Sequence, residues 1–175
     1  MKAWEIPADC KSFENLRKVV RPNPQVGPGQ ILMRVRATSI NARDNSVAAG
    51  RYLGGVPHGD IIALSDGAGE VLETGAGVTR FKKGDRVAAI FAPGWLDGAP
   101  TPAMTGRAAT DDGMLCEFVT MNENDAVAIP KHLSFSEAAT LPCAAVTAWQ
   151  ALFERDRPTQ EGDVVLVQEI GRAHV

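Results

Sequence analysis

The stretch that decides the fold is SDGAGEVLETGAGVTRFKKGDRV, Ser65 to Val87, in which glycines interrupt an apolar strand pattern. Its glycines are Gly67, Gly69, Gly75, Gly77 and Gly84. Glycine in a strand pattern indicates backbone that turns with positive φ or that closely approaches another group. The apolar residues between them are Val71, Val78, Phe81 and Val87. The stretch predicts three short strands and two tight turns at a buried edge of a β-barrel, with Gly84-Asp85 as the second turn.

The composition is that of an ordinary globular chain with 175 residues, 45% hydrophobic content and a net charge of -3. The length favours one domain, or one domain and part of another. The net charge gives no reason to expect nucleic acid as a partner. No apolar run approaches the span of a bilayer, and MKAWEIPADC at the N-terminus lacks the apolar stretch of a signal peptide, so no membrane association is expected.

The three cysteines are Cys10, Cys116 and Cys143, which are widely spaced and form no CxxC pair. Neither a disulfide framework nor a four-cysteine zinc loop is therefore expected. This usage predicts a reducing, cytoplasmic setting.

The first two thirds of the chain predict a β-rich body. Strands are expected over Lys2 to Ile6, Leu16 to Arg21, Gln30 to Ile40, Arg86 to Phe91, Leu115 to Met121 and Ala126 to Ile129. Gln30 to Ile40 alternates apolar with polar side chains most clearly. A short helix or turn should follow at Asn41 and end at Gly50. The loop from Pro93 to Gly113 is long enough to suggest a functional or mobile segment.

The predicted structure changes from strands to helices at Ser134, where SFSE has the form of a capping box that starts a helix. A longer helix is expected after Pro142, with Ala145, Ala148, Trp149 and Leu152 at helical spacing. Val164 to Val167 is apolar on both faces, as in the centre of a parallel sheet. The predicted order is a β-rich body, two helices and the first strand of an α/β unit.

Four collinear segments resemble the medium-chain dehydrogenase/reductase superfamily, in particular its zinc-independent members that are similar to quinone oxidoreductases and alcohol dehydrogenases. The segments are SINARD at Ser39, the glycine-rich stretch, Cys116 to Pro142, and VTAWQAL followed by GDVVLV. The resemblance implies a GroES-like β-barrel over residues 1–130. Linking helices and the first strand of a truncated Rossmann domain would occupy 131–168.

The resemblance also implies the activity, which is hydride transfer between NAD or NADP and a carbonyl, an activated alkene or a quinone. The partner of the site would be a small-molecule substrate, and the intact parent protein is expected to be a homodimer. In such a parent the dinucleotide lies on a glycine turn after the first Rossmann strand.

Zinc-dependent relatives place metal ligands at positions that here hold Asn41, Ser65-Asp66 and Cys143. Only Cys143 is a soft donor, whereas a catalytic zinc needs three protein ligands and an open position. The loop from Pro93 to Gly113 contains no cysteine for a structural zinc. We therefore expect no zinc, and we expect Cys143 to be a small buried apolar residue.

Without zinc, hydride transfer depends on positioning and on hydrogen bonds to the developing oxyanion. The resemblance places Asn41 beside the nicotinamide as a catalytic and cofactor-binding residue; the alternative is a helix cap. Arg43 is the second catalytic candidate, able to steady the substrate oxygen or a phosphate. Its alternative, favoured by the sequence alone, is a solvated surface charge.

Two further residues are candidates for binding the cofactor. Asp44 could bind the ribose or orient Arg43, or it could simply be an acid at a helix N-terminus. Thr147 matches a family threonine on the nicotinamide side, the alternative being a hydroxyl that bonds back to its own helix. Tyr52, His58 and Trp95 are additional candidates for the cleft.

After Gln168 the chain reads EIGRAHV instead of the glycine-rich fingerprint that the resemblance implies. These residues can be back-translated as GAG ATC GGA AGA GCA CAC GTC, a common sequencing-adapter sequence. We therefore expect residues 169–175 to be non-native, and we expect the 175-residue chain to be an inactive fragment. One alternative is a natural short protein with a divergent terminus. Another is a stand-alone GroES-like module for binding or assembly.

Overall fold

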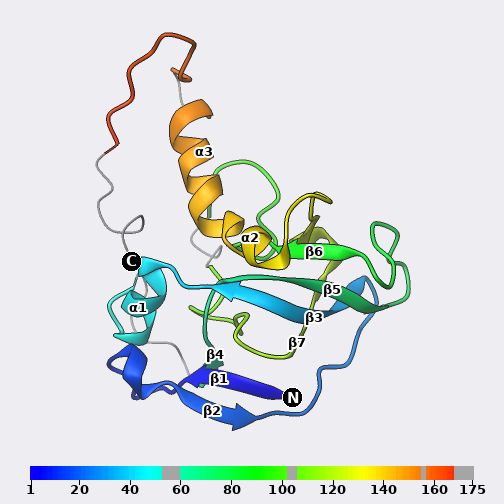
Figure 1. The fold of residues 1–175 in the computed structure, drawn as a ribbon. Coiled ribbons are helices and arrows are strands. Elements are labelled where there is room, and N and C mark those ends of the chain that lie inside the picture. Colours follow the sequence, from blue (N-terminus) through cyan, green and yellow to red (C-terminus); the bar gives the residue numbers. More distant parts are fainter. Residues whose placement is uncertain (53–59, 102–105, 155–156, 168–175) are drawn as a thin grey trace.

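The computed structural model describes residues 1–52, 60–101, 106–154 and 157–167, which form two antiparallel sheets and a few short helices (Figure 1). The smaller sheet has the order β2-β1-β4, with β1 at Lys2–Ile6, β2 at Arg17–Val20 and β4 at Ile61–Ile62. The larger sheet has the order β7-β3-β5-β6-β8. Its strands are β3 at Gln30–Ser39, β5 at Asp66–Thr74, β6 at Arg86–Ala89, β7 at Phe118–Asn122 and β8 at Ala126–Ala128.

The glycine-rich stretch folds differently from the prediction, because its first part is one nine-residue strand, β5. This strand lies between β3 and β6, so it occupies the centre of the sheet and not a barrel edge. Gly69 is required by close approach, since an added Cβ would overlap the carbonyl oxygen of Arg34. Gly77 and Gly84 instead have φ of +82° and +91° and form the turns between β5 and β6.

The predicted alternation of β3 is confirmed, and it builds the main core. Ile31 and Met33 are buried, whereas Arg34 and Arg36 on the other face are exposed. The core between the strands consists of Ile31, Met33, Val71, Val87, Ala89, Met114, Val119, Met121 and Ala126. Burial of this face specifies the register of the strands, because a slip by one residue would expose the core residues.

The two sheets are joined by the segment that precedes β7. Ala3 of β1 forms an isolated bridge with Cys116. The backbone N–H of Trp4 donates to the carbonyl of Leu115 at 2.9 Å, and that of Val35 in β3 donates to the carbonyl of Glu117 at 3.0 Å. These contacts curl the sheets toward one another, and the predicted fold class, mainly β with some helices, is confirmed.

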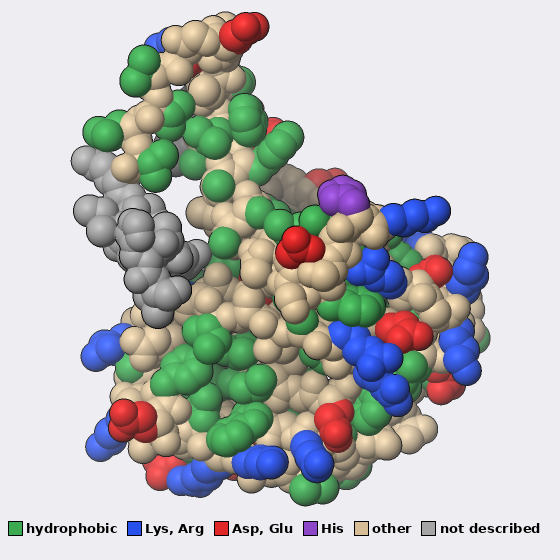
Figure 2. Space-filling view, in the orientation of Figure 1, with side chains coloured by type: hydrophobic (Ala, Val, Ile, Leu, Met, Phe, Trp, Pro, Cys, Tyr) green, Lys and Arg blue, Asp and Glu red, His purple; other side chains and the backbone are tan. Residues whose placement is uncertain are grey.

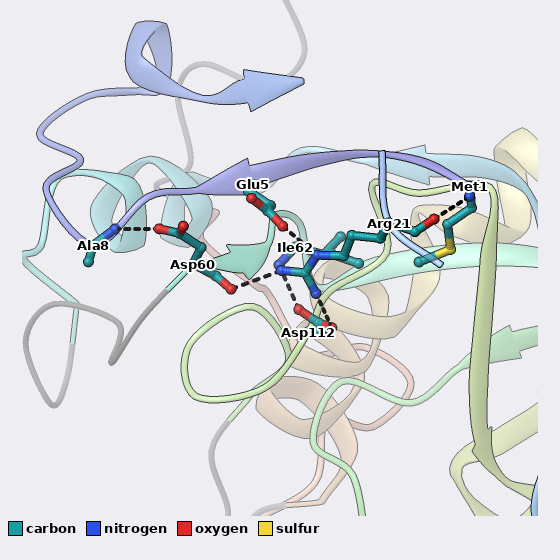
Figure 3. Close-up of polar contacts among 7 residues, drawn as sticks. All are labelled: Met1, Glu5, Ala8, Arg21, Asp60, Ile62 and Asp112. Atoms are coloured by element: carbon teal, nitrogen blue, oxygen red, sulfur yellow. Dashed lines mark hydrogen bonds and ion pairs between the residues drawn. The ribbon is translucent and has the colours of Figure 1, made fainter. Parts of the chain in front are cut away.

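Arg21, directly after β2, ties the smaller sheet to two loops (Figure 3). Its guanidinium donates to Glu5, to Asp112 Oδ2 at 2.7 Å and to the carbonyl of Asp60 at 2.9 Å. Its own carbonyl accepts a hydrogen bond from the N-terminal ammonium of Met1. One side chain therefore connects β1, the start of β4 and the loop before β7.

The helices lie beside and above the larger sheet (Figure 1). They are α1 at Ala42–Ala48, α2 at Phe135–Ala139, a π-helical turn at Leu141–Ala145 and α3 at Val146–Phe153, with 3₁₀ turns at Phe13–Asn15 and Glu123–Asp125. The predicted capping box of α2 is confirmed, because Glu137 N–H donates to Ser134 Oγ at 3.2 Å and Ser134 N–H donates to Glu137 Oε2 at 2.7 Å. Ala138 and Ala139 then pack on Ala68 of β5.

The end of the described chain departs from the prediction, since 164–167 forms no strand. No strand of the described residues pairs with it, so its backbone has no ladder to join and its side chains stay exposed. Helix α3 projects from the sheets, and Val146, Trp149 and Phe153 are exposed on it. Figure 2 shows hydrophobic side chains along this projecting part. In the described ranges no helix is long and apolar enough to cross a membrane.

Candidate functional site

The predicted site residues converge where β3 ends and β5 begins. Ser39, the last residue of β3, pairs with Asp66, the first residue of β5. Ser39 Oγ also donates to the carbonyl of Ala139 at 3.0 Å, which brings the end of α2 to the same place. Asn41 follows β3, and Cys143 lies in the π-helical turn after α2, so segments far apart in the sequence meet here.

Asn41 begins α1 and is almost completely buried, with 4% of its surface exposed. Its backbone N–H donates to Asp44 Oδ2 at 2.8 Å, the reciprocal arm of a capping box. The interpretation of Asn41 as a helix cap is therefore confirmed. Its side-chain nitrogen Nδ2 is buried and has no hydrogen-bond partner among the described residues.

Arg43 is not the solvated surface charge that the sequence alone favours, since its side chain is only 8% exposed. The guanidinium carbon lies 4.5 Å from the centroid of the Tyr52 ring and 4.9 Å from that of Phe91. Nη1 donates to Asp44 Oδ1 at 3.1 Å and to the carbonyl of Arg107 at 2.9 Å. Nε and Nη2 are buried and have no partner in the described part of the chain.

Asp44 joins these two residues, because its two carboxylate oxygens accept from Asn41 and Arg43 respectively. It is 2% exposed, and this burial raises the pKa of the carboxyl; the Asn41 N–H and the Arg43 charge act in the opposite direction. Asp44 is thus both an acid at the start of α1 and the group that orients Arg43. Its role toward a cofactor ribose stays a prediction.

Ser65 and Asp66 are fully buried beside this group. Ser65 Oγ donates to Asp66 Oδ1 at 2.8 Å, and the backbone N–H of Cys143 donates to Asp66 Oδ2 at 2.9 Å. Leu64 has a φ of +67°, a left-handed conformation that leucine rarely adopts. Such strain is often retained at functional sites, because the surroundings must hold it in place.

Cys143 is partly exposed and not fully buried as predicted, since the π-helical turn that carries it contains no buried residue. Thr147 Oγ1 donates to the carbonyl of Cys143 at 2.6 Å. The predicted alternative for Thr147, a hydroxyl bonding back to its own helix, is therefore confirmed, and its contact with a cofactor stays a prediction. Across the described ranges, no group of three or more His, Cys, Asp or Glu could hold a metal ion.

Two members of this site were not among the predicted residues. Phe91 stacks on Arg43, and the carbonyl of Arg107 accepts from it. Arg107 is itself only 5% exposed, and its Nη2 has no partner among the described residues. Arg107 lies in the loop from Pro93 to Gly113, which the sequence predicts to be functional or mobile, and Phe91 lies just before that loop. No other feature of the sequence indicated either residue. Of the other cleft candidates, Tyr52 contacts Arg43, Trp95 Nε1 bonds to the carbonyl of Gly98 at 3.1 Å, and His58 lies outside the described residues.

Comparison with known proteins gives consistent matches. The family model "Alcohol dehydrogenase GroES-like domain" matches residues 27–131. A zinc-type alcohol dehydrogenase-like protein of Schizosaccharomyces pombe is 38% identical over 173 residues, which cover 96% of this chain and 49% of that protein. A chloroplast envelope quinone oxidoreductase homolog of Arabidopsis thaliana is 34% identical over 138 residues, covering 78% of this chain and 37% of that protein.

Among solved structures, a cobalt- and zinc-bound thermostable alcohol dehydrogenase from Pyrobaculum aerophilum superposes with a TM-score of 0.72. It is 29% identical, and the match covers 86% of this chain and 47% of that one. The chain thus spans about half the length, or less, of the relatives that it matches.

Proposed function

Because this chain belongs to the GroES-like alcohol dehydrogenase family of the medium-chain dehydrogenase/reductase superfamily, we propose that it supplies the substrate side of a zinc-independent, NAD(P)H-dependent oxidoreductase. The intact parent would transfer hydride between nicotinamide and a carbonyl, an activated alkene or a quinone. The substrate domain would cover residues 1–130, and 131–168 would lead into the dinucleotide-binding domain. We place the parent in the cytoplasm as a homodimer.

The observation that carries this proposal is the donor set at the junction of β3 and β5. The side-chain nitrogens of Asn41 and Arg43 that have no partner among the described residues are buried there, and they could donate to a substrate oxygen. Hydrogen-bond donors aimed at an oxygen that gains negative charge stabilise the transition state of hydride transfer. Asp44 holds the backbone of Asn41 and the guanidinium of Arg43 through its two oxygens, so the Arg43 donors are positioned before the substrate arrives.

Zinc does not fit these residues. Asn41 offers an amide and Ser65 a hydroxyl, whereas a catalytic zinc site takes thiolate, imidazole or carboxylate ligands. Ser65 Oγ already donates to Asp66 Oδ1, and Asp66 Oδ2 accepts from the Cys143 backbone. Cys143 would be the single soft donor. The proposed hydride transfer therefore uses no metal.

A nicotinamide cofactor fits the residues better. Asn41 Nδ2 could donate to the carboxamide of the cofactor or to the substrate oxygen. Thr147 in α3 lies four residues after Cys143, to whose carbonyl its hydroxyl donates. When bound, the nicotinamide supplies the hydride. The residues of this chain would orient the acceptor and stabilise its oxygen. We expect the 175-residue chain to bind dinucleotide weakly or not at all, and to show no turnover.

The test is transfer of deuterium from 4-deuterated NADPH or NADH by the intact parent to a carbonyl compound (an aldehyde or a 2-oxo acid), an activated alkene (an enone or a 2-enoic acid) or a quinone, with the product analysed by mass spectrometry. Asn41→Ser keeps a capping residue and removes the amide donor, so it should lower kcat about 100-fold. The matched control is Asn45→Ser, at an exposed position of the same helix, which should leave kcat unchanged. Absence of deuterium transfer to all three acceptor classes would reject the proposal, as would an Asn41→Ser variant with unchanged kcat.

A stand-alone binding or assembly module remains the second candidate, and the exposed apolar residues of α3 are the observation that favours it. Such a module should give one defined oligomer of the short chain in gel filtration. The oxidoreductase proposal predicts no such oligomer, because that apolar surface would be covered by the dinucleotide-binding domain of the parent.

A further inference from the structure

The unpaired buried groups at the site have one chemical property in common. In the described part of the chain, the buried side-chain atoms without a hydrogen-bond partner are all nitrogen donors, namely Asn41 Nδ2, Arg43 Nε, Arg43 Nη2 and Arg107 Nη2. No buried side-chain oxygen there is left without a donor. A ligand that completes this site must therefore offer acceptor oxygens.

The unpaired donors of Arg43 lie on one side of its guanidinium group. Nη1 is saturated, because it donates to Asp44 Oδ1 and to the carbonyl of Arg107. Nε and Nη2 together form the opposite edge, where two N–H bonds point the same way. This edge matches the two oxygens of a carboxylate, which arginine binds through paired, parallel hydrogen bonds.

The edge is also held in place. Tyr52 and Phe91 both lie within cation–π distance of the guanidinium, and the ion pair with Asp44 fixes its rotation. Arginine is otherwise a flexible side chain, so immobilising it in advance lowers the entropy cost of binding. A buried donor without a partner destabilises a fold, and a charged one more so, which makes an unused arginine edge unusual.

Asn41 adds a donor in the same neighbourhood. The Asn41 backbone N–H and Arg43 Nη1 bond to opposite oxygens of the single Asp44 carboxylate. The unpaired Nδ2 of Asn41 and the unpaired edge of Arg43 thus belong to two residues held by one group. A ligand with two acceptor groups would satisfy the unpaired donors of both residues.

We propose that the substrate carries a carboxylate next to its reducible group, as in a 2-oxo acid or a 2-enoic acid. The carboxylate binds to Nε and Nη2 of Arg43, and Asn41 Nδ2 donates to a neighbouring oxygen. This inference rests on the proposed function for the assignment of the site to substrate, and it narrows the substrate class. An uncharged aldehyde offers one oxygen to the unpaired donors of Arg43 and Asn41, and no negative charge to the guanidinium.

The side-chain ¹⁵N–¹H signal of Arg43 Nε tests this directly in the 175-residue chain without a cofactor. The signal is assigned with Arg43→Lys, and the chain is titrated with pyruvate, with acrylate and with methyl pyruvate. Methyl pyruvate keeps the reducible carbonyl and removes the charge. We expect a saturable shift with pyruvate or acrylate and none with the ester.

Arg43→Lys keeps the charge and loses the paired donors, so the affinity for pyruvate should fall at least about 10-fold. The matched control is Arg36→Lys, at an exposed arginine of β3, which should bind as the unmodified chain does. If Arg43→Lys does not fold, the comparison of pyruvate with methyl pyruvate in the unmodified chain still tests whether binding requires the carboxylate.

No saturable shift, or an equal shift with the ester, would overturn the inference, as would unchanged binding by Arg43→Lys. Deuterium transfer by the parent to uncharged aldehydes, combined with no binding of pyruvate or acrylate, would reject the carboxylate and leave the proposed function standing. Failure of the parent to transfer deuterium to any acceptor would reject the proposed function, whatever the NMR titration shows.

Discussion

The backbone N–H of Cys143 donates to Asp66 Oδ2 at 2.9 Å, joining residues that lie 77 positions apart. Asp66 begins the central strand β5, and Cys143 lies in the π-helical turn that leads into α3. Because Asp66 Oδ1 also accepts from Ser65 Oγ, the carboxylate is occupied on both sides and is fully buried. This contact attaches the helical segment to the sheet at the candidate site.

Removal of the Asp66 carboxylate should therefore destabilise the fold. Asp66→Ala removes the acceptor of the buried Ser65 hydroxyl and of the partly buried Cys143 N–H, and it should cost about 3 kcal/mol in the free energy of unfolding. Urea denaturation followed by circular dichroism measures this. Asp9→Ala is the control, since Asp9 is 76% exposed in its pair with Arg17 and its loss should cost less than about 1 kcal/mol. Equal costs for the two variants would contradict the structure.

The two kinds of glycine in the Ser65 to Val87 stretch should respond differently to alanine. A Cβ on Gly69 would overlap the backbone oxygen of Arg34, which cannot move without breaking the sheet, so Gly69→Ala should cost about 3 kcal/mol or more. Gly77 has open space around it and only a positive φ, so Gly77→Ala should cost about 1 kcal/mol. Thermal unfolding of both variants checks the order, and a reversed order would refute the central placement of β5.

Arg21 should contribute more to stability than a typical surface arginine (Figure 3). Its side chain is 26% exposed and bonds to Glu5, whose own side chain is 12% exposed. Arg21→Ala leaves that carboxylate without its cation and should cost about 2 to 3 kcal/mol. Arg17→Ala removes only the exposed pair with Asp9 and should cost below about 1 kcal/mol. Urea midpoints that do not differ between the two variants would exclude this role for Arg21.

Two carboxyl groups should titrate in opposite directions from their ordinary values. Burial raises the pKa of Asp44, so its stabilising contribution is complete below the ordinary value of 3.8 and is lost as pH rises through the folded-state value. Hydrogen bonds from the Ser134 backbone and hydroxyl lower the pKa of Glu137, so its contribution is present above 4.5 and is lost as pH falls through the folded-state value. Titration of the carboxyl ¹³C signals measures both shifts; shifts of the same sign would contradict the described environments.

Local patterns in the sequence were sufficient to predict β3 and the starts of α1 and α2. Alternation over Gln30 to Ile40 depends only on which face of a strand is buried, and the box at Ser134 depends on four consecutive residues. The continuity of β5 could not be predicted in this way. The space around Gly69 is set by Arg34 on a neighbouring strand, which the glycine pattern itself does not reveal.

The environment of Arg43 was missed for the same reason. Its burial depends on Tyr52 and Phe91, which approach it only in the folded chain. The valine-rich segment at 164–167 also depends on distant residues, because an apolar run becomes a strand only where a neighbouring strand offers backbone partners. In the described residues no such neighbour is present.

The central claim is that the cleft of the intact parent binds the oxygens of its substrate through Asn41 and Arg43 and not through zinc. The most direct measurement is zinc content and the rate of NADPH or NADH oxidation on one sample of the parent, before and after dialysis against a chelator. We predict no stoichiometric zinc and the same rate in both states. One zinc per chain, with activity that is lost on chelation and restored by added zinc, would contradict the claim.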